Sequence, residues 1–154
     1  MNGPVETLPP KVRRVSARDI VMGAAASRDW QPQHHDHAHA LAMNLPGIIM
    51  NAPTQTGWLH AYAMRWAGPG ARIGRWKLVM LEPICPDTEL ALSGVVTQRE
   101  KGPSGLDWAW LDLAIVAGAQ HKSTMRLVIA VPAAPDQTGW AISDEEWQVP
   151  PLSG

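Results

Sequence analysis

Residues 46–70 read PGIIMNAPTQTGWLHAYAMRWAGPG, and this stretch decides the fold. Thr54 or Thr56 can serve as the N-cap of a helix, because a hydroxyl accepts from the free N–H groups of a first turn. The run Gly68-Pro69-Gly70 ends that helix. Between these signals, apolar residues recur at helical spacing, at Trp58, Leu59, Tyr62, Ala63 and Trp66. The pattern predicts a central helix that is buried on much of its surface.

After this helix the sequence period changes to that of strands. Apolar and other residues alternate over four runs, at 75–80, 90–96, 108–115 and 125–131. Turn-forming residues separate the runs. An antiparallel sheet with one apolar face must cover that face, and the preceding helix is the obvious cover. The periodicity therefore predicts an α+β domain in which a long antiparallel sheet packs on one helix.

Two shorter helices are expected before the central one. Ser16 and Asp19 have the spacing of a capping box, which predicts a helix over about 17–26. Asp36 is a candidate N-cap for a second short helix, which ends before Pro46.

The two ends of the chain are expected to be irregular. Residues 1–15 predict an extended N-terminal arm, because Pro9 and Pro10 block a helix. A tail at 133–154 is rich in proline and acidic residues and is expected to lie across a partner. One domain at 16–132 lies between the arm and the tail.

Composition narrows the class of protein. The 154 residues suit one compact domain. The formal net charge is −1 without a dense Lys/Arg stripe, which gives no electrostatic basis for binding nucleic acid or an anionic membrane. The only cysteine is Cys85, and no apolar run resembles a signal peptide or a membrane span. These features favour a cytoplasmic protein.

The segment Asp29-Trp30-Gln31-Pro32-Gln33-His34 carries the candidate chemistry. It places a carboxylate and an imidazole five residues apart in a proline-containing loop, where both can converge on one point. Such a pair can exchange protons with one water molecule near neutral pH.

This segment resembles the motif of the MaoC-like and (R)-specific enoyl-CoA hydratases, which reads Gly-Asp-x-Asn-Pro-hydrophobic-His. Asp29, Pro32 and His34 match position for position, and Asp36 and Ala40 fit the usual continuation. The sequence departs from the motif at three positions, Arg28, Gln31 and Gln33. The resemblance implies a hot-dog fold, a long antiparallel sheet wrapped around a central helix. It also implies an acid/base pair made of Asp29 and His34.

A narrower resemblance is to the small hydratase subunits of steroid side-chain degradation. It rests on ArgAspTrpGln and HisHisAsp, followed by IleMetAsnAlaProThrGlnThrGly at 49–57. The resemblance implies a catalytic subunit that hydrates an enoyl-CoA with a bulky acyl group. It implies as partner a second MaoC-like hot-dog chain, often fused to an OB-fold-like domain, with a homodimer as the alternative. No cofactor is expected, since coenzyme A is part of the substrate.

The implied mechanism needs an oxyanion site. Backbone N–H groups at the start of the central helix would stabilise the enolate oxygen, with Gly57 and its neighbour Thr56 as candidates. Trp30 lies next to Asp29 in the sequence and is expected to line the pocket. Neither proton transfer can be assigned to Asp29 or His34 from sequence. The alternatives are a packing glycine at 57 and a helix-capping hydroxyl at Thr56.

Other functions remain open at this point. The residues from His34 to His39 include four histidines, and His35 and His39 are spaced for one helix face, yet no Cys or Glu nearby completes a metal site. A thioesterase of this fold usually carries a carboxylate on the central helix, and residues 54–67 contain none. A further alternative is a non-catalytic hot-dog partner that only shapes the acyl pocket. The presence of both Asp29 and His34 argues against this alternative.

The expected sheet also predicts that the protein forms oligomers. Exposed sheet edges invite pairing with another chain, so at least a dimer is expected. Trp108 and Trp110 lie on one strand face and predict a buried contact with the partner.

Overall fold

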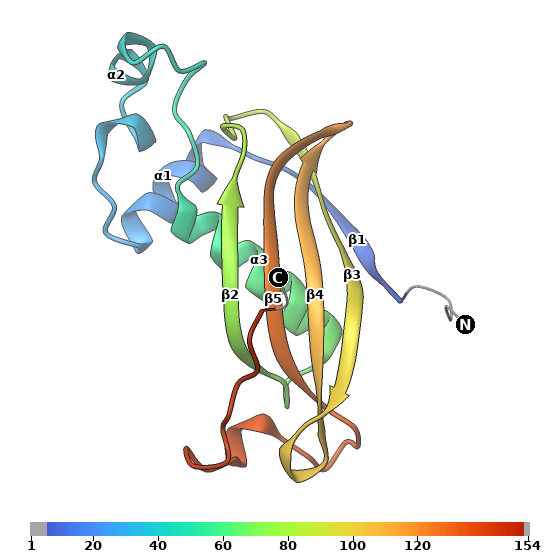
Figure 1. Cartoon of the computed structure of the whole chain (residues 1–154). Coiled ribbons are helices and arrows are strands. Elements are labelled where there is room, and N and C mark those ends of the chain that lie inside the picture. The colour runs from blue at the N-terminus through green and yellow to red at the C-terminus, as the bar shows by residue number, and fades with distance from the viewer. Residues whose placement is uncertain (1–5, 153–154) are drawn as a thin grey trace.

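The structure is a computed structural model that describes residues 6–152. One sheet contains five antiparallel strands in the order β1-β3-β4-β5-β2. Their bounds are β1 Thr7–Arg14, β2 Arg72–Met80, β3 Glu89–Lys101, β4 Leu106–Ala117 and β5 Gln120–Pro132. The helices are α1 Ala17–Ala26, α2 His37–Ala42 and α3 Ala52–Ala67. Helix α3 crosses one face of the curved sheet, while α1 and α2 lie to one side of the sheet, near the end of β2 (Figure 1). This is the expected hot-dog arrangement.

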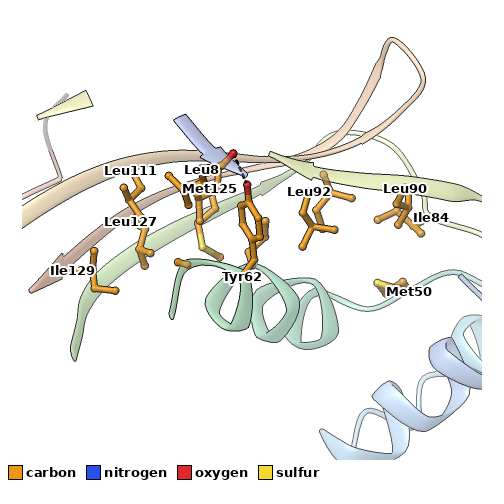
Figure 2. Close-up of a cluster of buried hydrophobic side chains, with 14 of the residues drawn as sticks. Leu8, Met50, Tyr62, Ile84, Leu90, Leu92, Leu111, Met125, Leu127 and Ile129 are labelled. Carbon is orange, nitrogen blue, oxygen red and sulfur yellow. Dashed lines mark hydrogen bonds between the residues drawn. The ribbon is translucent and has the colours of Figure 1, made fainter. Parts of the chain in front are cut away.

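The core lies between α3 and the face of the sheet that it covers, here called the inner face. Alternate residues of β4 and β5 point toward the helix, among them Leu111, Met125 and Leu127 (Figure 2). Leu59, Tyr62 and Ala63 of α3 meet them from the other side. The period of two in the strands and the helical spacing in α3 therefore bury the two apolar surfaces that the sequence predicted.

The N-terminal arm is part of the sheet, contrary to the expectation that residues 1–15 lie outside the domain. Residues 7–14 form edge strand β1, which pairs with β3 from Thr7↔Val95 to Arg14↔Glu89. The register shifts between Leu8 and Lys11, at the two prolines. A proline cannot donate a ladder hydrogen bond, so it is tolerated only at an edge or a bulge, and both conditions hold here. Residues 1–5 of the arm lie outside the described residues.

The predicted helix starts are right for α1 and α2 and wrong for α3. Ser16 and Asp19 form the expected capping box, and Asp36 caps α2. The N-cap of α3 is Asn51, whose side chain accepts from the N–H of Thr54. Thr54 is thus the capped residue, because Pro53 suits the first helical turn and moves the start upstream.

The tail covers part of the outer face of the sheet, opposite α3. Trp108 and Trp110 of β4 are 5% and 6% exposed, and they form a second core with Ile142, Trp147, Val149 and Leu152. The indole N–H of Trp110 donates to the Pro151 carbonyl at 3.0 Å. Figure 1 shows the tail running over the strands on the side away from α3. The prediction that these two tryptophans form a partner contact is therefore wrong, since the chain's own tail buries them.

Within residues 6–152, no helix is both long enough and apolar enough to cross a membrane.

Candidate active site

Asp29 and His34 lie in the segment that leaves α1 and leads into α2. The N–H of Asp29 donates to the Ala24 carbonyl at 2.9 Å, which fixes the turn after α1. A short 3₁₀ turn, Pro32–His34, then brings the imidazole back. His34 Nε2 and Asp29 Oδ2 are 3.3 Å apart, with side chains that are 7% and 20% exposed. The structure thus brings together the two residues that the sequence singled out, in a sheltered place still open on one side.

Arg28, one of the departures from the hydratase motif, adopts an unusual backbone conformation. Its φ is +54°, in the left-handed region that glycine enters without steric cost. The motif has glycine at this position. The arginine therefore keeps the geometry of the turn but bears strain that glycine would avoid.

A hydrogen bond at its second ring nitrogen fixes the orientation of the His34 ring. Nδ1 lies 2.7 Å from the carbonyl oxygen of Ile49, which can only accept a hydrogen bond. Nδ1 therefore carries a proton, and in the neutral ring Nε2 is the unprotonated nitrogen. Its lone pair faces the Asp29 carboxylate at 3.3 Å, so a proton donor such as water that bonds to both groups would lie beside the pair.

Asn51 anchors the carboxylate of Asp29. Its Nδ2 donates to Asp29 Oδ2 and to Ser27 Oγ, both at 2.9 Å, and its Oδ1 accepts from the N–H of Thr54. The hydrogen bond from Asn51 is the main cause that lowers the pKa of Asp29, and the nearby His34 adds to it, against an opposing effect of desolvation. Asp29 is consequently ionised near neutral pH.

The anchor also ties the pair to the start of α3. The first N–H groups of a helix have no acceptor within the helix. Thr54 is capped by Asn51 and Pro53 has no N–H, so Asn51 and Ala52 provide the N–H groups that remain at this end. The positive end of the helix dipole therefore lies beside the carboxylate and imidazole.

The other predicted site residues are placed differently. Gly57 lies in the second turn of α3, where the ordinary acceptor of its N–H is the Pro53 carbonyl. A Cβ at Gly57 would meet nothing within 4 Å, so the residue presents open backbone surface. Thr56 beside it is half-buried. The Trp30 side chain is 65% exposed, and its carbonyl oxygen lies 3.2 Å from His35 Nε2. A substrate-binding role for these three residues stays a prediction.

The histidine-rich stretch does not converge on one point. Among residues 6–152, no group of three or more His, Cys, Asp or Glu side chains is placed to hold a metal ion. His35 and His37 are exposed, and the backbone N–H of His39 donates to the capping side chain of Asp36.

Sequence reasoning missed Asn51 and the carbonyl of Ile49. The signal for Asn51 was present, since asparagine two residues before proline is a favourable N-cap. Its second contact, to Asp29, joins residues 22 positions apart and has no local signal. The Ile49 carbonyl is a backbone group, which a sequence pattern cannot mark.

Known proteins share both sequence and fold with this chain. The sequence model of the MaoC-like domain matches residues 4–105. The beta subunit of the 3-oxo-4,17-pregnadiene-20-carboxyl-CoA hydratase of Mycobacterium tuberculosis is 37% identical over 83 residues. That match covers 54% of this chain and 64% of the relative, so the chain spans less than two thirds of that protein's length.

Two solved structures extend the likeness to the whole fold. A chain of the ChsH1-ChsH2 complex from M. tuberculosis is similar with a TM-score of 0.77 and 27% identity, over 85% of this chain and 99% of that one. An (R)-hydratase from A. caviae involved in PHA biosynthesis has a TM-score of 0.74 and 22% identity, over 85% and 98% of the two chains. The second likeness is of fold alone.

Proposed function

The chain belongs to the MaoC-like domain family, and on that premise we propose that it is a hydratase that adds water across the 2,3 double bond of an enoyl-CoA thioester. The observation that carries the proposal is the pair of Asp29 and His34, 3.3 Å apart, beside the N-terminus of α3. A carboxylate oxygen and an unprotonated imidazole nitrogen at this distance can both bond to one water molecule that lies beside them.

The chemistry then proceeds in two proton transfers. His34 Nε2 accepts a proton from the water while the hydroxyl bonds to carbon 3 of the thioester, and Asp29 stabilises the resulting imidazolium. Negative charge moves to the thioester oxygen, which the N–H groups of Asn51 and Ala52 would stabilise. The imidazolium then returns the proton to carbon 2. Water is thus added without any redox change, and the ring ends in its starting state.

A second chain is the proposed partner. Strand β2 is an edge of the sheet, paired on one side only with β5. Its end exposes apolar side chains, which are 41–56% accessible at Trp76, Val79, Met80 and Leu81. An edge of this kind is suited to pair with another sheet, and a partner would cover these side chains. The similarity to a chain of a two-protein complex supports a second MaoC-like chain as that partner. The name of the curated relative supports a bulky, steroid-like acyl group.

One assay tests the proposal. The chain is incubated with straight-chain and steroid-like 2-enoyl-CoA thioesters, alone and co-expressed with a second MaoC-like chain, and loss of the conjugated thioester absorbance is followed. We expect hydration, with the bulky substrate requiring the second chain. If the thioester is instead cleaved to free CoA, the protein is a thioesterase. If the pair hydrates the substrate equally well with Asp29→Asn in this chain, the chain is a non-catalytic partner.

A further inference from the structure

Three buried polar atoms have no hydrogen-bond partner among residues 6–152. They are Oε1 of Gln55, Nε2 of His60 and Oγ of Ser123. Gln55 is 2% exposed and Ser123 is fully buried. Buried polar atoms in folded proteins nearly always have a partner, so an exception calls for a group that supplies one.

All three residues are next to the same strand, since Gln55 and His60 of α3 contact side chains of β2 and Ser123 pairs with a residue of β2. Gln55 Nε2 donates to the Met50 carbonyl at 3.2 Å and lies 3.6 Å from Met80 Sδ. Ser123 of β5 pairs with Met80 in the ladder. The ring of His60 meets Trp76 edge-on, with centroids 4.5 Å apart. We call these five residues the α3–β2 seam: Gln55, His60, Trp76, Met80 and Ser123.

The seam begins next to the acid/base pair. Gln55 follows Asn51 by four residues on α3, so the two side chains share a helix face about 6 Å apart along the axis. Asn51 holds Asp29, and Gln55 bonds to the carbonyl of the residue just before Asn51. A thioester held at the start of α3 would therefore have the seam within reach of its acyl chain.

We propose that the α3–β2 seam binds the acyl group of the substrate and selects acyl groups that carry a hydroxyl. The inference rests on the proposed function and names a substrate class for it. The carbonyl oxygen of Gln55 can only accept a hydrogen bond, so it fits the hydroxyl of an acyl group as donor. The Ser123 hydroxyl can donate a hydrogen bond to the oxygen of that same acyl hydroxyl. Burial lowers the pKa of His60, so its neutral ring is able to accept or donate one further bond.

Apolar side chains lie beside these polar atoms. Trp76 and Met80 are 48% and 56% exposed at the edge, and both present apolar surface on the side of β2 that faces α3. An acyl group with a largely apolar body and one hydroxyl would contact these apolar side chains and also bond to the buried polar atoms. An unsubstituted alkyl chain would leave the polar atoms without partners. Acyl groups with a hydroxyl would therefore be preferred over unsubstituted ones.

The test compares two substrates on the same variants. One is a straight-chain 2-enoyl-CoA, and the other is its analogue with a hydroxyl beyond carbon 4. The readout is the ratio of kcat/KM for the hydroxylated substrate to that for the plain one. We expect Ser123→Ala and Gln55→Leu each to lower this ratio about tenfold, the size of one lost hydrogen bond. Because both substrates meet the same variant, a loss of stability cancels from the ratio.

Gln120→Leu is the matched control, since Gln120 is the exposed first residue of β5 and its side chain accepts a hydrogen bond from Lys122. It should leave the ratio unchanged. If Ser123→Ala and Gln55→Leu also leave the ratio unchanged, the unpartnered atoms do not select the acyl group and the proposal is overturned.

A binding measurement separates this proposal from the proposed function. The rise in Tm caused by the saturated acyl-CoA thioesters, with and without the hydroxyl, needs no turnover. If the wild type hydrates neither enoyl-CoA, the hydratase proposal fails. A larger rise in Tm with the hydroxylated thioester, lost in Ser123→Ala, would still support the seam, and equal rises would contradict it.

Discussion

The two faces of the sheet are closed in different ways. On the outer face the chain's own tail lies over Trp108 and Trp110, with the Trp147 ring 5.0 Å from Trp108 and Arg72 stacked 3.9 Å from Trp147. On the inner face α3 covers the sheet, and three buried polar atoms there have no hydrogen-bond partner within the described part of the chain. Around Trp108 and Trp110 the outer face is thus a closed core, whereas the inner face has buried polar atoms that we propose bind a ligand. We expect the reaction to take place at the end of the inner face. We expect the packing of the outer face to contribute to the stability of the fold.

Loss of the acid/base pair should have the largest effect. Asp29→Asn and His34→Ala are each expected to lower kcat about 10²–10⁴-fold, the range for a positioned proton-transfer group. The fold should survive, because both residues lie between helices rather than in either core. Enoyl-CoA hydration kinetics with a thermal melt of each variant test this prediction.

His121→Ala is the matched control, since its imidazole is exposed on β5. Its rate should equal that of the wild type. A chelator is also expected to leave the wild-type rate unchanged. Full activity in either Asp29→Asn or His34→Ala would remove the pair from the mechanism.

Changes at Asn51 should alter the pH dependence of the reaction. Its hydrogen bond lowers the pKa of Asp29, so Asn51→Ala should raise that pKa and move the acid limb of kcat/KM to higher pH. The variant also loses the N-cap of α3, which costs roughly 0.5–2 kcal/mol of stability. A pH–rate profile and an unfolding curve measure the two effects.

The Asn51→Asp variant separates the effect on the pKa of Asp29 from the effect on stability. A carboxylate can still cap the helix, but its charge beside Asp29 should raise the pKa of Asp29 further. The acid limb should therefore lie at a higher pH than in Asn51→Ala, with less loss of stability. An acid limb that stays in place in both variants would show that the ionisation of Asp29 does not govern the rate.

Trp147→Ala tests whether the outer face serves stability alone. The substitution removes the ring that packs on Trp108 and the cation–π contact with Arg72, for a loss of roughly 1–3 kcal/mol. Activity measured below the melting temperature should be unchanged. Denaturant unfolding and hydration rates check the two parts. A loss of activity without a loss of stability would mean that the tail acts on the inner face.

The sequence predicted the elements with strong local signals. The capping box at Ser16 gave the start of α1, and the alternation at Leu111 and Leu127 gave the inner face. It missed β1 because the two prolines, read alone, block regular structure, and only the partner strand β3 makes a bulged edge possible. It placed the acid and base in one loop. The Asn51 anchor and the unpartnered atoms of Gln55 and Ser123 depend on packing between distant segments, which no local pattern encodes.

The smallest expected effect is at Arg28, in the turn that separates α1 from the acid/base pair. Its positive φ costs a residue with a Cβ more than it costs glycine, while glycine loses more entropy on folding. The first effect should exceed the second here, so Arg28→Gly should raise the free energy of unfolding by about 0.5–1 kcal/mol. Arg28→Ala removes the same charge but keeps the Cβ, so it should not stabilise. Chemical denaturation of both variants measures the difference. Equal stabilities would show that the turn bears no strain, and a lower kcat in the glycine variant would show that the turn positions Asp29 through its stiffness.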